Sequence, residues 1–325
     1  MRHKVLVTRE VFDDVLDALR AHAQVVDNPS DTPLTAQALA AAAADADAIV
    51  CALTDRIDAA LLAQCPRLRV VSNIAVGYNN IDVPACTARG VMATNTPGVL
   101  DETTADFAWT LLLGAARRIT EAERYLRDGR WTGWQLKQLL GADVHHATLG
   151  IIGMGRIGQA IARRALGFEM NVLYCNRSRL PEATEQRLNA RWVDQATLLA
   201  QSDFVVLMVP YSPATHHLIG AAELAQMKRS AILINTARGG VVDDAALIEA
   251  LAAGTIAGAG LDVFEGEPAY DARFRALENV VLAPHIASSS VATRRAMAML
   301  AARNALAALA GERPPNLLNP DVKPR

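Results

Sequence analysis

The stretch LGIIGMGRIGQAIARRALG, residues 149–167, decides the fold of the second half of the chain. It begins with an apolar run typical of a buried strand, passes through Gly153-x-Gly155-x-x-Gly158, and continues with the period of an amphipathic helix. This pattern between a strand and a helix is typical of a dinucleotide-binding βαβ unit. The first glycine permits the tight turn, the second lets backbone approach a pyrophosphate, and the third lets helix and strand pack closely.

Apolar runs continue on both sides of that turn. Six of them predict strands from residue 148 onward: TLGII (148–152), NVLYC (171–175), DFVVLMV (203–209), AILIN (231–235), GAGLDV (258–263) and VVLAP (280–284). Separated by helical stretches, they match the strand count of a full dinucleotide-binding sheet. We therefore expect a parallel sheet covered by helices on both faces.

The first 95 residues show the same alternation. Five runs, at 4–8, 23–27, 47–52, 69–74 and 90–95, predict strands buried on both faces, and helices are expected at 11–20, 35–44, 57–64 and 83–89. One long helix is expected over 102–127, and a last helix over 289–310 follows the completed second sheet.

These patterns predict an α/β protein of two Rossmann-like domains with doubly wound parallel sheets. The expected substrate (catalytic) domain is discontinuous and flavodoxin-like, formed by residues 1–99 plus 286–325. Residues 100–285 are expected to form the dinucleotide-binding domain.

Composition narrows the class of protein. The 325 residues carry a formal net charge of −2, which offers no global attraction to nucleic acid or to an anionic membrane. The four cysteines are far apart and fit neither a disulfide framework nor a zinc site. No signal peptide and no run long enough to span a membrane is expected, so we predict a cytoplasmic enzyme with no nucleic-acid or membrane partner.

The loop after the second strand of the unit is expected to bind the cofactor's ribose. An NAD-binding protein usually has an acidic residue there, but this chain has Asn176 followed by Arg177, Ser178 and Arg179. An asparagine does not repel a 2′-phosphate, the arginines can bind one through planar forks, and the serine can donate to it. We therefore predict NADPH as the cofactor, with NADH used at lower efficiency.

Three charged or titratable side chains follow successive strands of the second series. Arg238 lies in INTARGGVVD, Glu267 in LDVFEGEP and His285 in VVLAPHIASS. Ligands of parallel sheets bind beyond the carboxyl ends of the strands, where these side chains are expected to gather. An arginine can hold a carboxylate, a histidine can protonate a carbonyl oxygen, and a glutamate can hold the imidazole in place and favour its charged form. The set predicts reduction of a 2-keto acid to a 2-hydroxy acid.

Several long segments, among them VGYNNIDV, TADFAWTLLL, LGIIGMGRIG, ILINTARGGVVDDAALIEAL, GAGLDVFEGEP and VVLAPHIAS, make the chain resemble the D-2-hydroxy-acid dehydrogenase family over nearly its whole length. CALTDRID, DGRWTGW and the NRS loop are most similar to the glyoxylate/hydroxypyruvate reductases and 2-ketogluconate reductases, a branch that commonly uses NADPH. The resemblance implies that Arg238, Glu267 and His285 are catalytic and that the substrate is glyoxylate, hydroxypyruvate or 2-ketogluconate.

The resemblance also implies roles for further residues. The backbone amides of Val76 and Gly77 would bind the substrate carboxylate, and Leu53 would line the substrate pocket. Trp134 would reach the active site of a partner subunit, which implies a homodimer with a dimerisation arm near 100–145. Further cofactor contacts are implied for Thr104, Arg156, Ile157, Val209, Pro210, Thr215, Thr236, Ala237, Asp262 and Ala287.

Ala287 departs from the family pattern, because many relatives have glycine there, and its methyl group could crowd the nicotinamide amide. No metal site is expected, since His145–His146 and His216–His217 have no second ligand set at suitable spacing. Two alternative functions remain open: a non-catalytic dinucleotide-sensing binding protein, and a phosphoglycerate- or phosphite-type dehydrogenase of the same fold.

Overall fold

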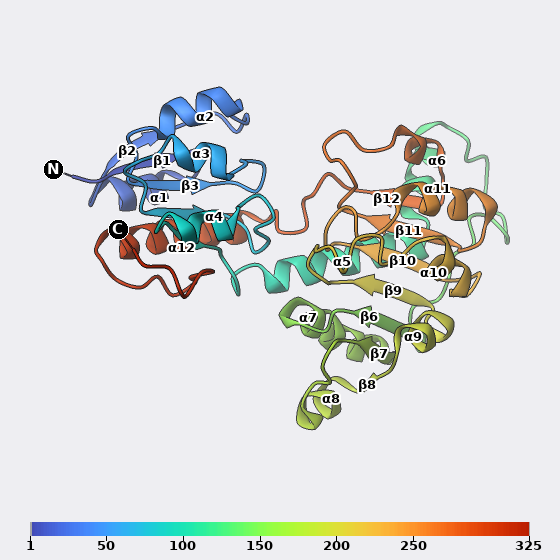
Figure 1. Ribbon diagram of the computed structural model, residues 1–325. Helices are drawn as coiled ribbons and strands as arrows, with labels where there is room; N and C mark the ends of the chain where they lie inside the picture. The colour runs from blue at the N-terminus through green and yellow to red at the C-terminus, as the bar shows by residue number, and fades with distance from the viewer. Residues whose placement is uncertain (1, 325) are drawn as a thin grey trace. The chain divides into compact units, whose positions relative to one another are not determined.

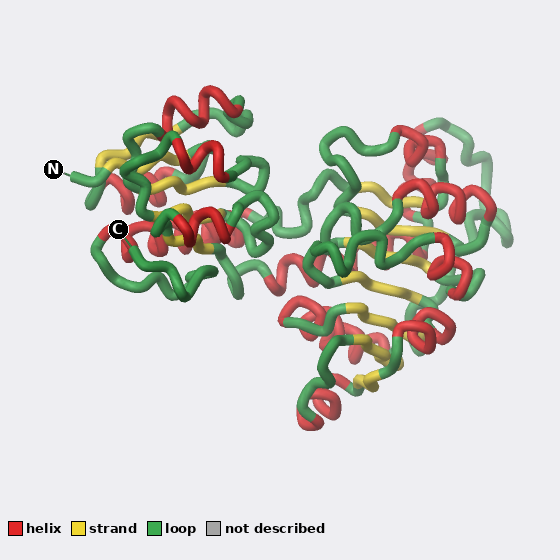
Figure 2. The backbone as a smooth tube through the Cα atoms, in the orientation of Figure 1, coloured by secondary structure: helices red, strands yellow, loops and turns green. Residues whose placement is uncertain are grey.

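The computed structural model describes residues 2–324, which divide into two compact units. Unit 1 consists of Met1–Leu100 together with Ser289–Arg325, and unit 2 consists of Asp101–Ser288. Figure 1 shows each unit as a central sheet with helices on both sides, and the strands of both sheets are yellow in Figure 2. Two α/β domains with parallel sheets, as the strand pattern predicts, are thereby confirmed.

Unit 1 is built on a parallel sheet of five strands in the order β2-β1-β3-β4-β5. Its strands are β1 (Lys4–Val7), β2 (Gln24–Asp27), β3 (Ala48–Cys51), β4 (Val70–Asn73) and β5 (Met92–Thr94). Its helices are α1 (Asp13–Arg20), α2 (Ala36–Ala43), α3 (Ala59–Ala63), α4 (Val83–Ala88) and α12 (Val291–Leu309). Side chains of Thr35, Asp58 and Asp82 cap the starts of α2, α3 and α4, because each accepts a backbone N–H of the first turn.

Helix α12 covers one face of the unit 1 sheet together with α1. Its buried face is a row of small side chains, including Ala298, Ala301, Ala305 and Ala308, which lets the helix lie close to β3 and β4. Helices α2, α3 and α4 form the core on the other face. The first sheet therefore depends on a helix from the far end of the chain.

Unit 2 is built on a parallel sheet of seven strands in the order β12-β11-β10-β9-β6-β7-β8. The strands are β6 (Thr148–Ile152), β7 (Asn171–Cys175), β8 (Ala190–Trp192), β9 (Phe204–Leu207), β10 (Ile232–Asn235), β11 (Gly258–Leu261) and β12 (Val280–Leu282). The helices are α5 (Asp101–Ala116), α6 (Ile119–Arg127), α7 (Arg156–Ala165), α8 (Glu182–Leu188), α9 (Gln195–Gln201), α10 (Ala221–Gln226) and α11 (Asp244–Ala253). Two short 3-10 helices, Leu166–Phe168 and Ala272–Ala276, complete the unit.

The two faces of the unit 2 sheet carry different helices. Helices α5 and α7 pack on one face around Trp109, whose ring stacks on that of Phe168 at 4.7 Å. Helices α9, α10 and α11 contribute to the core on the other face. Helix α7 begins at the glycine turn and α11 begins after the loop that carries Arg238, so this packing positions both loops at the carboxyl ends of β6 and β10.

Three details of the sequence-based prediction are wrong. Strand β2 is half exposed rather than buried on both faces, because it lies at the edge of its sheet. The second sheet has a seventh strand, β8, which extends the β7 edge. The predicted helix over 102–127 is two helices, α5 and α6, separated by Arg118 in the left-handed region at φ 54°.

The break between α5 and α6 has a clear set of contacts. The Arg118 guanidinium binds Glu121 through two bonds of 2.7 Å and donates to the carbonyl of Leu140. The carbonyl of Ala116 accepts from the N–H of Ala142 instead of continuing a helical ladder. The returning segment around residues 140–142 therefore ends α5, and no glycine or proline is needed at the break.

Candidate active site

The glycine turn of unit 2 leads directly from β6 into α7. Gly153 is in the left-handed region at φ 102°, and a methyl group on it would lie 2.6 Å from the backbone of Met208. A methyl group at Gly158 would collide with the carbonyl oxygen of Gly153. At Gly155, by contrast, no atom lies within 4 Å of where a methyl group would be, so the backbone is open to a ligand. The turn therefore fits the pyrophosphate of a dinucleotide at the N-terminus of α7.

Residues 176–179 follow β7 beside this turn. The Oδ1 atom of Asn176 accepts the N–H of Met154 at 2.7 Å, which ties the ribose loop to the glycine turn. Arg177 and Ser178 are exposed side chains. Asn176 thus lies where the residue that binds the cofactor's ribose is expected. Its Nδ2 group takes no part in the bond with Met154 and can donate to a ligand.

Arg179 has an additional partner that the sequence pattern did not predict. Its Nε and Nη2 atoms bind the carboxylate of Glu185 on α8, at 2.9 and 2.7 Å. The same carboxylate accepts the hydroxyl of Tyr174 at 2.6 Å, and Tyr174 in turn accepts the N–H of Leu180. The bonds from Arg179 and Tyr174 hold the pKa of Glu185 below its ordinary value. Arg179 therefore anchors the loop to α8.

Arg238 follows β10 in a turn that Asn235 holds. Asn235 donates to the carbonyl of Arg238 at 3.2 Å and accepts the N–H of Ala237 at 3.0 Å. A methyl group at Gly239 would collide with the carbonyl oxygen of Phe264, so this turn lies directly against the loop that leads to Glu267. Burial lowers the pKa of the Arg238 guanidinium, and the charge of Glu267 opposes that change.

His285 and Glu267 form the shortest contact of the site. The Nδ1 atom of His285 lies 2.6 Å from Oε1 of Glu267, while Oε2 of Glu267 accepts the N–H of Phe264 at 3.3 Å. Burial alone would raise the pKa of Glu267, but its hydrogen bond and charge interaction with His285 reverse this and hold the pKa below its ordinary value. The carboxylate is therefore ionised near neutral pH and is directed at the imidazole.

The turn that carries His285 is held by Asp262. His285 is in the left-handed region at φ 55°, which is uncommon for a residue with a side chain. Its N–H donates to the carbonyl of Asp262, and the two carboxylate oxygens of Asp262 accept the N–H groups of Ile286 and Ala287 at 2.7 and 2.8 Å. Burial raises the pKa of Asp262 and these two N–H groups oppose the change. Asp262 thus orients the histidine turn, a role for which the sequence contained no signal.

The other residues expected at the cofactor all belong to unit 2. Arg156 is exposed and its Nε lies 3.2 Å from Oδ2 of Asp101. Thr215 donates to the carbonyl of Pro210 at 2.8 Å, which closes the loop after β9. Buried or partly buried side chains complete the set: Thr104, Ile157, Val209, Thr236, Ala237 and Ala287.

The residues expected at the substrate carboxylate belong to unit 1. Leu53 follows β3, and Val76 and Gly77 follow β4, all partly buried. Trp134 of unit 2 is 79% exposed, among other exposed apolar side chains of residues 119–140. Their expected contacts with substrate and with a partner subunit stay predictions.

One histidine pair has a partner that sequence spacing did not reveal. Ligand atoms of His216, His217 and Glu265 all lie within 4.8 Å of one another. His216 is 3.2 Å from the Tyr211 hydroxyl, and Nε2 of His217 is 3.2 Å from Glu265. These hydrogen bonds account for the cluster, and the expectation that the chain uses no metal stays a prediction.

Comparison with known proteins places this architecture in a family. A family model described as D-isomer specific 2-hydroxyacid dehydrogenase, NAD binding domain, matches residues 109–287. The chain is 50% identical to a glyoxylate reductase of Thermococcus gammatolerans, with 99% of this chain and 97% of that protein covered. The chain belongs to the D-isomer specific 2-hydroxyacid dehydrogenase family.

Solved structures of similar proteins agree with this membership. A protein of Thermus thermophilus is 42% identical with a TM-score of 0.91, over 97% of this chain and 99% of that one. An NADPH-dependent glyoxylate/hydroxypyruvate reductase of Sinorhizobium meliloti, in complex with NADP and malonate, is 34% identical with a TM-score of 0.86, over 100% and 99% of the chains. As a 2-hydroxyacid dehydrogenase, the chain is an oxidoreductase with a nicotinamide dinucleotide cofactor. Among residues 2–324, no helix has both the length and the hydropathy needed to cross a membrane.

Proposed function

We propose that this 2-hydroxyacid dehydrogenase reduces a small 2-keto acid to the D-2-hydroxy acid with NADPH, and that glyoxylate, hydroxypyruvate and 2-ketogluconate are the candidate substrates. The observation that carries the proposal is the 2.6 Å contact between His285 and Glu267, with Arg238 close enough to interact with the same glutamate. The curated relatives named glyoxylate reductase favour glyoxylate among the three acids.

Each side chain of the set has a defined task in this reaction. Nδ1 of the His285 imidazolium donates to Glu267, which leaves the Nε2–H for the carbonyl oxygen of the substrate. Arg238, which is partly buried, binds the carboxylate and polarises the neighbouring carbonyl. A bound nicotinamide cofactor would supply the hydride that adds to C2. The proton from His285 completes the hydroxyl group, so the product is one hydride and one proton richer than the keto acid.

Binding of the substrate carboxylate is assigned to the backbone amides of Val76 and Gly77, with Leu53 against the rest of the substrate. Preference for NADPH is assigned mainly to Arg177 and Ser178, since the Nε and Nη2 donors of Arg179 bind Glu185. The Sinorhizobium meliloti reductase is NADPH-dependent and its structure holds NADP, which supports a phosphorylated cofactor for this chain as well.

We further propose a homodimer formed through the arm at residues 119–140. Large apolar side chains are exposed there: Ile119, Leu126, Trp131, Trp134, Leu136 and Leu140. A monomer in water rarely exposes so many in one segment, and a second copy would cover them.

The proposal is tested by a steady-state panel of the three keto acids against NADPH and NADH. We expect NADPH oxidation with at least one acid, a large loss of kcat in His285→Ala, and both a lower kcat and a higher KM in Arg238→Ala. His217→Ala is the matched control, because it removes another imidazole paired with a glutamate of the same loop. An unchanged kcat in His285→Ala would refute the assigned proton donor.

A further inference from the structure

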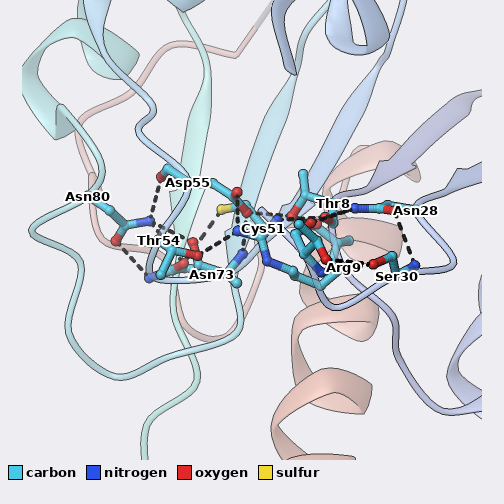
Figure 3. A network of polar contacts seen from close by, with 12 residues as sticks. Thr8, Arg9, Asn28, Ser30, Cys51, Thr54, Asp55, Asn73 and Asn80 are labelled. Atoms are coloured by element: carbon cyan, nitrogen blue, oxygen red, sulfur yellow. Dashed lines mark hydrogen bonds and ion pairs between the residues drawn. The ribbon is translucent and has the colours of Figure 1, made fainter. Parts of the chain in front are cut away.

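The two substrate loops of unit 1 are joined by a network of polar side chains, most of them buried or partly buried, shown in Figure 3. One loop follows β3 and contains Leu53, and the other follows β4 and contains Val76 and Gly77. In Figure 3, Asn80 and Asn73 lie at one end of the network, and Thr8 and Arg9 lie toward the other. Since the loops are connected through side chains, their relative position is set within unit 1.

One end of the network is a reciprocal pair of amides, Asn73 and Asn80. Nδ2 of Asn73 donates to Oδ1 of Asn80 at 3.1 Å, and Nδ2 of Asn80 donates back to Oδ1 of Asn73 at 3.2 Å. Asn73 also donates to the carbonyl of Gly77 at 2.8 Å. Burial raises the pKa of the Cys51 thiol well above its ordinary value, so the thiol stays protonated and can donate to Oδ1 of Asn73 at 3.5 Å. These partners fix which way the Asn73 amide is turned.

Asn80 connects the pair to the loop after β3. Its Nδ2 lies 3.2 Å from the carbonyl of Ala52 and 3.1 Å from the carbonyl of Asp55, which bracket Leu53. The N–H of Ile57 donates to the carbonyl of Asn80 at 2.8 Å. Asn80 is therefore bound to both substrate loops, and removing its amide would release one from the other.

A buried ion pair supports the loop after β3 from the other side. The carboxylate of Asp55 is 1% exposed and lies 2.8 Å from Nη2 of Arg9, which is 6% exposed. Asp55 also accepts the hydroxyl of Thr8 at 2.5 Å and the N–H of Ala52 at 2.9 Å, while Arg9 donates to Thr54. A buried charge with several partners is costly to displace, so the loop has one strongly preferred conformation.

The loop after β4 is supported in the same way from β5 and α12. Asn95 donates to the carbonyl of Val76 at 2.8 Å, and Asn304 of α12 donates to the carbonyl of Asn95 at 3.0 Å. The carbonyls of Val76 and Gly77 are thus both bound by asparagine side chains of the same unit. Among residues 2–324, the amide N–H groups of Val76 and Gly77 donate to no other group of the chain. Adjacent backbone N–H groups of this kind can bind an anion.

We propose that Asn73 and Asn80 are positioning residues that hold the Val76–Gly77 amides and the Leu53 loop as one preformed receptor for the substrate carboxylate. This inference rests on the proposed function, because it assigns the receptor to the same 2-keto acid. The asparagines act through the backbone and do not touch the substrate. Preformed donors bind an anion without the cost of ordering the loop, so the receptor contributes to substrate affinity.

The test uses the full-length enzyme with Asn80→Ala. The variant is expected to raise the KM for the best keto acid and the inhibition constant of oxamate, an unreactive carboxylate, by about tenfold or more, as for loss of a hydrogen bond to a charged group. The KM for NADPH is expected to stay unchanged. Asn319→Ala is the matched control, because Asn319 also makes three buried hydrogen bonds in unit 1, to Ala93, Thr87 and Val91, away from both substrate loops.

Two results separate this inference from the proposed function. If the wild-type enzyme reduces none of the acids, the proposed function fails. If it reduces them but Asn80→Ala and Asn319→Ala bind oxamate equally well, only the positioning role is overturned. Should Asn80→Ala fail to fold, Asn80→Asp keeps the side-chain shape and places an acceptor against the carbonyls of Ala52 and Asp55. Wild-type oxamate affinity in that variant would also overturn the role.

Discussion

Replacing Glu267 by glutamine tests the proposed proton donor through the pH dependence of kcat. Glu267 and His285 are joined by a 2.6 Å contact, and their side chains are 31% and 24% exposed. Hydrogen bonds to charged groups are worth about 1.5 to 3 kcal/mol. Because the pair is partly exposed, we take the lower end, about 1.5 kcal/mol, which equals a factor of about ten or one pH unit.

The direction of the effect follows from linkage between the two groups. The hydrogen bond and charge of His285 hold the pKa of Glu267 below its ordinary value, so the two side chains stabilise each other as an ion pair that glutamine cannot form. Reduction uses the protonated form, and its rate falls as pH rises. In Glu267→Gln the alkaline limb of the kcat profile is therefore expected about one pH unit lower, with about a tenfold loss of kcat above it and a smaller loss on the acid side.

The assay is keto-acid reduction at saturating cofactor across both limbs of the profile. Glu265→Gln provides the control, since it removes the carboxylate that pairs with His217 in the same loop and leaves the His285 contact intact. Superimposable alkaline limbs for wild type and Glu267→Gln would refute the reasoning, as would an equal displacement in Glu265→Gln.

Three further predictions concern the cofactor and the fold. Arg177→Ala is expected to lower kcat/KM for NADPH by about tenfold relative to NADH. Arg179→Ala is expected to lower it by less, because Arg179 binds Glu185. Equal losses of kcat/KM for NADPH and NADH in Arg177→Ala would contradict the assignment. Gly158→Ala should lower the unfolding free energy by about 1 to 3 kcal/mol, measured by thermal unfolding. Gly155→Ala should keep the fold and weaken cofactor binding, measured by titration with the cofactor. Burial raises the pKa of Asp244 from 3.8 to about 6, so its contribution to stability is lost as pH rises through that window. Asp244→Asn should then be about 1 to 2 kcal/mol more stable than wild type at neutral pH in urea unfolding, and a less stable variant would disprove the cause.

Much of the fold was predictable because buried parallel strands are continuous apolar runs. The run at residues 148–152 leads into a glycine turn and a helix, and the run at 204–207 follows a helix, so their position and type were both readable. Strand β8 was missed because it has three residues, of which Arg191 and Trp192 are exposed. The break at Arg118 was missed because a returning segment imposes it, and a remote contact leaves no local signal.

The placement of the proposed catalytic residues after successive strands was predictable from the sequence, whereas the groups that orient them were not. Arg238, Glu267 and His285 each follow a strand whose carboxyl end faces the same edge of the sheet. Asp262 and Asn235 act through backbone contacts that only the folded turns create. The pairing of Arg179 had a local signal, an acid six residues later at the start of a helix.

The packing of α12 on the sheet of unit 1 has a consequence for biosynthesis. Synthesis proceeds from the N-terminus, so the leading hundred residues leave the ribosome without the helix that covers β3 and β4. Unit 2 is formed by one continuous segment. It can therefore fold before the first hundred residues have the helix that covers their sheet. A nonsense mutation shortly before residue 291 would therefore spare the nucleotide-binding unit and abolish the folding of the opposite end of the polypeptide.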